Sequence, residues 1–198
     1  MVTPNGAREL SLSEILTLGR STHFFTTQEV DDATLGRIFD LMKWGPTSFN
    51  SQPARFHFLR STAARERLLP ALSRSNREKT LKAPMTVLVA YSPRFYEKLP
   101  VGVLNEATMQ MFRGNPDLAP ETALRNSTLQ GAYFMMSAGS MGLGVGPMSG
   151  FDPGAVNRTF FVDGQQVVNF LINLGYPAQA NARPRGHRFA FTDVVRIQ

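Results

Sequence analysis

Cysteine is absent from the sequence. Without it the chain can form no disulfide, thiolate metal site or iron–sulfur cluster, and it has no cysteine nucleophile. We therefore expect no metal site, and any redox chemistry must come from a bound cofactor.

Long apolar runs are also absent. No stretch reaches the roughly 18 apolar residues that are needed to cross a bilayer. The N-terminal residues MVTPNGARELS contain no apolar signal core. The sequence therefore predicts a cytoplasmic protein that makes no contact with a membrane.

Acidic residues are fewer than basic ones. There are 15 Asp and Glu against 21 Lys and Arg, which gives a formal net charge of +6. A basic chain favours an anionic ligand or surface, and nucleic acid is the first partner to consider. The arginines are scattered, however, and no nucleic-acid-binding motif accompanies them, so we expect no nucleic-acid partner.

The length and the apolar pattern predict one domain, residues 1–198, because 198 residues with 42% hydrophobic content fill one core and are short for two. Two apolar strands are expected at 84–91 and 167–176, and an alternating one from Arg55 to Arg60. Residues 73–84 are predicted to be a linker, and residues 95–115 a helix, a lid over a site, or both. Helices are expected over residues 12–18, from 31 or 32 to 44, and over 62–72, 121–141 and 153–160.

A polar stretch bounded by prolines follows the second predicted helix, at residues 44–56, WGPTSFNSQPARF. Pro46 cannot continue a helix, and Pro53 pushes Gln52 toward extended geometry. The enclosed hydroxyls and amides can each donate or accept, which suits the edge of a planar heterocycle. An ordinary turn is the alternative. The candidate ligand-binding residues are Pro46, Thr47, Ser48, Asn50 and Gln52.

Two familiar motifs match this sequence poorly: a dinucleotide-binding loop, which we reject, and a serine-hydrolase elbow, which stays a rival interpretation. Residues 142–153, GLGVGPMSGFDP, follow a predicted helix where a dinucleotide-binding loop would follow a strand, so these glycines are interpreted as helix-ending residues. The nearest approach to a serine-hydrolase elbow, residues 138–142, begins with Ala inside a helical pattern. His57 alternates outward on a strand and has no triad partner nearby in sequence, so we interpret it as solvent-facing.

The order of these segments resembles the nitroreductase-like flavoprotein family. PTSFNSQPARF is similar to the family's Pro-Ser-x-x-Asn-x-Gln-Pro segment, and GRSTHFF to its Arg-Arg-Ser-x-Arg-x-Phe segment, with Gly19 and His23 replacing arginines. PMSGFD and GYP also match. The chain is most similar to the malonic semialdehyde reductase branch. The resemblance implies an α+β, three-layer fold with a mainly antiparallel central sheet between helices, and a homodimer holding FMN at its interface.

The resemblance also assigns cofactor-binding residues to positions in this chain. Arg20, Ser21 and His23 would hold the FMN phosphate together with Arg185 and Arg188, with Arg183 in reserve. A solvated basic tail is the alternative for these last arginines. Asn76 would face the pyrimidine edge of the flavin unless it is an exposed loop amide. The backbone at Pro147, Met148, Ser149 and Gly150 would approach the ring.

The activity that the resemblance implies is ping-pong hydride transfer from NADH or NADPH through FMN to a small acceptor, with no catalytic side chain. The branch implies reduction of malonic semialdehyde to 3-hydroxypropionate. Nitroaromatics, quinones or enones are alternative acceptors, and a non-catalytic flavin-binding protein is the alternative class. Arg55, where relatives have an aromatic residue, and Phe112 in the predicted lid are the candidate substrate contacts.

Overall fold

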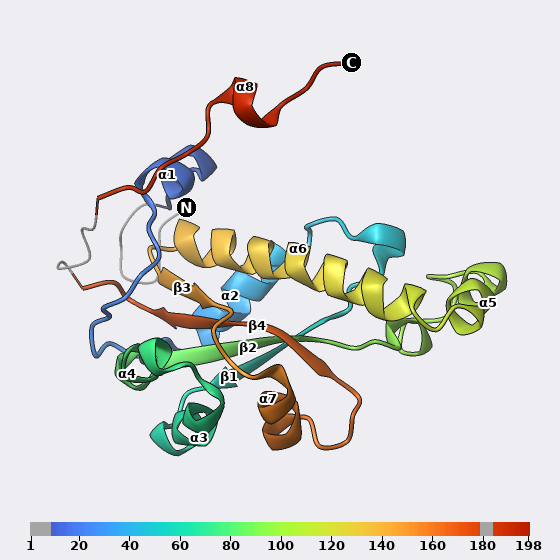
Figure 1. The fold of residues 1–198 in the computed structure, drawn as a ribbon, viewed down its shortest axis with the longest axis horizontal. Coiled ribbons are helices and arrows are strands. Elements are labelled where there is room, and N and C mark those ends of the chain that lie inside the picture. The colour runs from blue at the N-terminus through green and yellow to red at the C-terminus, as the bar shows by residue number, and fades with distance from the viewer. Residues whose placement is uncertain (1–8, 179–183) are drawn as a thin grey trace.

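A computed structural model describes residues 9–178 and 184–198. Its centre is a four-stranded sheet in the order β1-β2-β4-β3, and every neighbouring pair is antiparallel. The strands are β1 (Ala54–Leu59), β2 (Met85–Tyr91), β3 (Gly144–Met148) and β4 (Val167–Gly175). The structure confirms the predicted α+β class with an antiparallel sheet (Figure 1).

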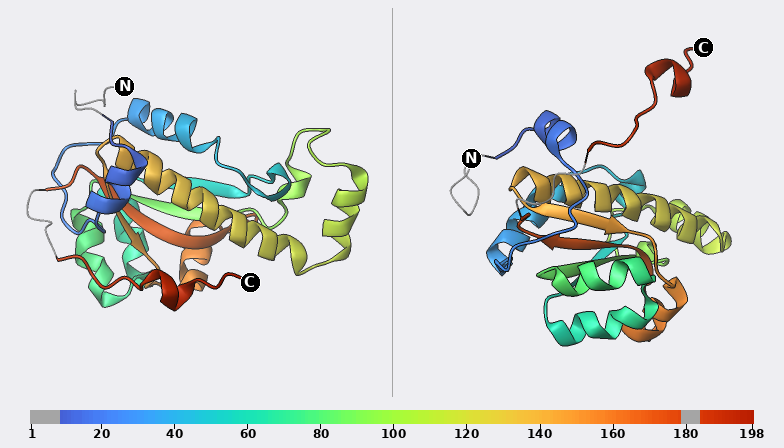
Figure 2. Two further views of the ribbon diagram at one scale, coloured as in Figure 1. Left: turned by 90° about the horizontal axis from the view of Figure 1, so that it is seen from above. Right: turned by 60° about the vertical axis from the view of Figure 1, so that its left-hand side comes forward.

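Helices cover both faces of this sheet. Helices α2 (Asp32–Met42) and α6 (Leu118–Ser140) lie on one face, and α3 (Thr62–Leu68), α4 (Arg74–Lys82) and α7 (Pro153–Phe160) lie on the other (Figures 1 and 2). Successive strand residues point to opposite faces of the sheet and form a hydrophobic core on each. Val87 and Ile172 pack toward α6, and Leu88 and Leu171 pack toward α3 and α7. The predicted three-layer arrangement is therefore confirmed.

Capping residues fix where the helices begin. The side chains of Ser11, Asp31, Ser61 and Asp152 each accept a hydrogen bond from a backbone amide three residues on, which satisfies a donor that the first helical turn leaves unpaired. Ser11 begins α1 (Leu12–Leu18). The helices that follow begin at residues 12, 32, 62 and 153, in agreement with the predicted starts.

The predicted linker at 73–84 is wrong, because residues Arg74–Lys82 form helix α4. Its sequence, RSNREKTLK, has no apolar stripe, and its buried residues are the polar Asn76 and Thr80. The predicted helix 62–72 is too long: α3 ends at Leu68, and a 3₁₀ turn, η2 (Leu69–Ala71), follows around Pro70. Proline lacks the amide that would continue the helix.

Strand β3 was not predicted. It contains two glycines and a proline, which are depleted in strands. Only glycine fits at position 146, because the backbone of Thr22 passes close to it. A Cβ on residue 146 would lie 2.6 Å from the Thr22 carbonyl oxygen. Thr22 donates its amide to the Val145 carbonyl at 2.8 Å, so residues 20–23 run beside this strand.

Residues 95–115 form a helical excursion, made of the 3₁₀ turn η3 (Phe95–Glu97) and helix α5 (Glu106–Gly114). It extends beyond the sheet at one end of the molecule (Figure 2). Its apolar cluster of Phe95, Tyr96, Leu104 and Phe112 packs on Ala119 and Ala123 of α6. This contact explains why α6 begins at Leu118, before the predicted start at residue 121.

The C-terminal segment, residues 184–198, leaves the body of the protomer and carries the short helix α8 (Phe191–Val194) (Figures 1 and 2). Its apolar side chains are exposed: Phe189 to 71%, Phe191 to 66% and Ile197 to 89%. Helix α1 likewise buries none of its residues. Across the described ranges, no helix has the length and apolar character needed to cross a bilayer.

Candidate functional site

The polar stretch predicted between Pro46 and Pro53 is held by α6. The Ser48 amide donates to Asn126 Oδ1 at 2.7 Å, and the Ala54 amide donates to Gln130 Oε1 at 2.9 Å. Asn126 and Gln130 are both buried. A third bond runs from the Tyr133 hydroxyl to the Pro46 carbonyl at 3.0 Å. We call residues 46–52 the polar loop.

The backbone of the polar loop is strained. Phe49, Asn50 and Gln52 have φ values of 55°, 50° and 39°, in the left-handed region that side chains other than glycine rarely adopt. The predicted extended geometry at Gln52 is therefore wrong, because its amide donates to Thr47 Oγ1 and its side chain to Asn50 Oδ1, which closes the turn. Strain of this kind concentrates at binding sites, where the surroundings impose it.

A second group of candidate residues gathers where α4 meets the end of β3. Asn76 Nδ2 donates to the Gly150 carbonyl at 2.9 Å, and the Ser73 amide donates to the same oxygen at 3.0 Å. Asn76 is only 6% exposed, so the interpretation as an exposed loop amide is wrong. The segment 147–150 is thus fixed against α4, with residues 20–23 on the other side of β3.

Basic side chains converge beside residues 20–23. Arg185 Nη2 donates to the carbonyls of Thr17 and Leu16 at the end of α1. Desolvation, followed by repulsion from Arg20 and Arg188, lowers the pKa of Arg185. Arg20 Nη1 donates to the Thr17 and Gly19 carbonyls that also accept from Arg185, so cations from the two ends of the chain gather at the end of α1. The reserve candidate, Arg183, lies outside the described residues.

These two half-sites lie toward opposite ends of α6. Asn126 anchors the polar loop, whereas the Ser140 carbonyl accepts the Leu10 amide beside the basic cluster. The anchors of the polar loop run from Asn126 to Tyr133, so seven to fourteen residues separate them from Ser140, about 10–21 Å at 1.5 Å per helical residue. Figure 1 shows β3 and α1 at the C-terminal end of α6, away from the excursion that packs on its N-terminal end. Within one chain the two half-sites are therefore separated along α6.

Comparison with known proteins agrees with this assembly of segments. The model of the nitroreductase family matches residues 20–176. The chain belongs to the nitroreductase family. A relative from Burkholderia lata, provisionally named NADH dehydrogenase/NAD(P)H nitroreductase, is 45% identical over 188 residues, which cover 95% of this chain and 96% of the relative.

Solved structures of other nitroreductase-family proteins share the fold. One from Bacillus subtilis superposes with a TM-score of 0.82 at 25% identity and covers 94% of this chain and 98% of its own. Another, from Exiguobacterium sibiricum and solved in complex with FMN, has a TM-score of 0.83 at 18% identity and covers 96% and 99% of the two chains. At these identities the likeness establishes the shared architecture.

The candidate substrate residues lie at the edge of the polar loop. Arg55 Nη1 donates to the Gln52 and Ala54 carbonyls at 3.1 and 2.7 Å, and burial lowers its pKa. Arg55 also lines an apolar cavity of about 510 Å³ between α2 and β1. Phe112 is 2% exposed and touches the Phe49 ring edge-on at 5.8 Å between centroids. Its side chain thus reaches the loop through Phe49.

One further candidate residue beside Asn76 was missed in the sequence analysis. Lys79 follows Asn76 by three residues on α4, so both side chains lie on the same side of that helix. Lys79 is half-buried. Had residues 74–82 been recognised as a helix, the Asn-x-x-Lys spacing would have placed a cation beside the Asn76 amide.

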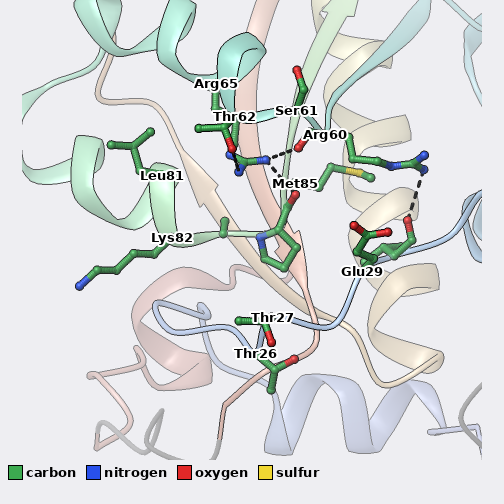
Figure 3. Close-up of a pocket in the computed structure, with 13 residues that line it drawn as sticks. Thr26, Thr27, Glu29, Arg60, Ser61, Thr62, Arg65, Leu81, Lys82 and Met85 are labelled. Atoms are coloured by element: carbon green, nitrogen blue, oxygen red, sulfur yellow. Dashed lines mark hydrogen bonds between the residues drawn. The ribbon is translucent and has the colours of Figure 1, made fainter.

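A further cavity of about 620 Å³ lies between α3, α4 and residues 26–30 (Figure 3). Its three cations do not converge, because Arg65 donates to the Pro84 carbonyl, Arg60 pairs with Asp32, and Lys82 pairs with Glu78. Figure 3 shows Lys82 and Arg60 pointing away from each other. We therefore do not include this cavity in the candidate site.

His57 is half-buried and not solvent-facing as predicted. Its Nε2 lies 2.6 Å from Gln166 Oε1, and its ring contacts Phe161 with 4.9 Å between centroids. These contacts explain the residue structurally. Among residues 9–178 and 184–198, no three His, Cys, Asp or Glu side chains group in a way that would hold a metal ion.

The anchoring of the polar loop by Asn126 can be tested directly. Asn126→Ala leaves the part-buried Ser48 amide without an acceptor, which costs about 1–3 kcal/mol and releases the strained turn. We expect faster amide hydrogen exchange across residues 44–56, measured by mass spectrometry. Thr128→Ala is the control, because the Thr128 hydroxyl donates to the Leu124 carbonyl and accepts from Asn169, and neither bond reaches the polar loop. Unchanged exchange in Asn126→Ala would contradict this role.

Proposed function

We propose that this nitroreductase-family protein is a cytoplasmic, single-domain, FMN-dependent NAD(P)H oxidoreductase that works as a homodimer with FMN at the subunit interface. The observation that carries the proposal is the separation of the two half-sites along α6. The basic cluster and the Asn76–Gly150 contact offer one half, and the polar loop of a second copy offers the other. Each dimer then contains two complete sites related by its two-fold axis.

The basic half-site fits a phosphate. Arg20, Arg185 and Arg188 supply guanidinium forks that bind phosphate oxygens with charge-assisted hydrogen bonds, and Ser21 adds a hydroxyl donor. His23 adds a ring N–H. Bringing three like charges together is unfavourable unless an anion joins them, and the FMN phosphate is an anion of suitable charge. The weak match at Gly19 and His23 is offset by the two arginines of the tail.

The remaining groups fit the flavin ring. Asn76 lies on α4 and holds the Gly150 carbonyl, which fixes the backbone of Ser149 and Gly150 after the end of β3, and the ring edge presents both donors and acceptors. We assign Lys79 to the same edge, where its charge stabilises negative charge that develops on the ring. From the second copy, the polar loop contributes amides and hydroxyls of Thr47, Ser48, Asn50 and Gln52, with Pro46 fixing its entry.

FMN, when bound, supplies the redox chemistry, taking hydride from NAD(P)H and passing it to an acceptor. The residues of the chain hold the phosphate, orient the ring and exclude water. In this arrangement no side chain of the protein has to act as a nucleophile. The name of the Burkholderia relative and the FMN complex of the Exiguobacterium protein support the same assignment.

Exposed apolar surface supports the homodimer. Leu12, Leu16 and Leu18 of α1 are 61%, 52% and 66% exposed, and the C-terminal segment presents Phe189 and Phe191. The extension of that segment away from its own body favours packing of its apolar residues on the partner. A second copy of the chain would cover these surfaces, because burial of apolar area drives subunit association.

For the acceptor we propose malonic semialdehyde, which carries a carboxylate beside the aldehyde. The half-buried Arg55 is a cation that contacts the end of the polar loop through the Gln52 carbonyl, and a guanidinium binds carboxylates with two parallel bonds. A general nitroaromatic reductase is the second candidate, favoured by the name of the relative. In that case Phe49, which is 53% exposed, offers an aromatic surface to an uncharged acceptor.

The central test is spectroscopic. We expect the purified protein to bind FMN, to show the flavin absorption bands, and to bleach when NADH or NADPH is added without oxygen. Its mass in solution should be twice the 21.9 kDa of one chain. Protein that takes up no FMN when supplied with it contradicts the proposal, and protein that binds FMN without bleaching is a flavin-binding protein without this activity.

The phosphate assignment can be tested with Arg185→Ala combined with Arg188→Ala. Each lost bond to a charged group weakens binding by about 1.5–3 kcal/mol, so FMN should bind at least about tenfold more weakly in a fluorescence titration of the apoprotein. Riboflavin, which lacks the phosphate, should bind both proteins equally. Arg125→Ala removes a cation from the exposed face of α6, where it pairs with Glu121, and serves as the charge control.

The acceptor assignment can be tested with Arg55→Ala. We expect kcat/KM for malonic semialdehyde to fall by about tenfold or more, the loss of one charged hydrogen-bonding partner, while kcat/KM for an uncharged aldehyde of the same length stays close to wild type. Arg55→Lys keeps the charge and should retain part of the preference. An equal ratio of the two constants in all three proteins would rule out this role.

A further inference from the structure

A row of buried polar side chains crosses the centre of the sheet beneath the segment 147–150. Thr86 on β2 and Asn173 on β4 are paired directly across the ladder, and the Thr86 hydroxyl donates to Asn173 Oδ1 at 2.8 Å. Thr86 is 0% exposed and Asn173 is 1% exposed. Burying a polar group lowers the stability of the fold unless the group is hydrogen-bonded, so the presence of these side chains in the core requires an explanation.

The other end of the Asn173 carboxamide reaches the segment itself. Its Nδ2 lies 3.8 Å from the Met148 sulfur and 3.4 Å from Thr80 Oγ1, and the Thr80 hydroxyl also lies 3.8 Å from that sulfur. A thioether can only accept. The NH₂ of Asn173 therefore faces Met148 and its oxygen faces Thr86, whose hydroxyl donates to that oxygen and holds the carboxamide in this orientation.

Helix α4 is joined to the same segment at two places. Thr80 contacts the Met148 side chain, and one turn earlier Asn76 donates to the Gly150 carbonyl. Both α4 residues are buried and polar. Apolar side chains in these places would bury as well, but they would not fix the position of a backbone carbonyl. A fully paired polar network instead specifies one arrangement of the groups it joins.

We propose that Asn173 is a positioning residue for the flavin-contacting backbone of residues 147–150, and that Thr86 orients it. Asn173 locks Met148 on β3 and Thr80 on α4 in one register, so the amides of Ser149 and Gly150 keep a fixed direction. This inference rests on the proposed function for its effect on catalysis. The positioning itself is a property of the protein chain and can be measured without a cofactor.

The sharpest test compares Thr86→Val with Thr86→Ser. Valine has nearly the shape of threonine and lacks the hydroxyl, whereas serine keeps it. Thr86 has no hydrogen bond to Met148 or to residues 149–150, so any effect there passes through Asn173. In the FMN-bound protein we expect Thr86→Val to shift the flavin midpoint potential and to slow reduction by NAD(P)H about tenfold, equivalent to one hydrogen bond. Thr86→Ser should behave as wild type.

A second comparison separates positioning from stability. Asn173→Leu should show the same shift and slower reduction, together with faster amide exchange at Ser149 and Gly150 in the apoprotein. Asn169→Leu is the matched control, because Asn169 lies on the same strand and bonds to Ser127 and Thr128 of α6 instead. It should lower the unfolding temperature without moving the potential.

The outcomes distinguish this inference from the proposed function. If wild type fails to bind FMN or to react with NAD(P)H, the proposed function fails, and amide exchange in the apoprotein still tests the positioning. If wild type is active but Thr86→Val and Asn173→Leu keep its potential, reduction rate and amide exchange, Asn173 has only a structural role. Equal changes in Asn169→Leu would overturn the proposal in the same way.

Discussion

The fixed length of α6 is the constraint on which the candidate site depends. A helix advances about 1.5 Å per residue and does not shorten, so the polar loop bonded to Asn126 stays remote from the arginines near the other end. Packing against both β1 and β2 keeps this helix rigid. Each half-site is therefore precise but incomplete, and the exposed apolar residues of α1 and of the tail are the surfaces on which a second copy would complete it.

The two faces of the sheet differ in the kind of contact that holds the helices against them. The face toward α6 is filled by large apolar side chains such as Phe134 and Ile172. The face toward α4 includes a buried polar network, and α4 itself docks through Asn76 and Thr80. An apolar contact tolerates small shifts, whereas paired donors and acceptors do not. The polar contact occurs where the backbone of residues 147–150 meets the helix, which is where exact placement matters for a ligand.

Much of the fold could be predicted because local signals agreed with it. The capping residues Ser11 and Asp31 begin helices, and the apolar runs that became β2 and β4 are central strands. Helix α4 was missed because its stability comes from two polar contacts that leave no apolar period in the sequence. Strand β3 was missed because backbone pairing with β4 and with residues 20–23 outweighs the poor strand propensity of Gly146 and Pro147. Side chains that bond to distant backbone groups leave no local pattern.

The candidate residues themselves were named from the sequence, but their spacing along the chain does not say which of them gather in the same half-site. Under the proposed arrangement, the loop of one chain serves the cofactor held by the arginines of the other. A copy with a damaged loop would then disable the site of its partner and leave its own arginines in use. In a dimer of one altered and one normal subunit, a substitution in the polar loop would therefore lower the activity of the site whose arginines belong to the normal subunit. Selection for turnover would then act on the dimer as a whole.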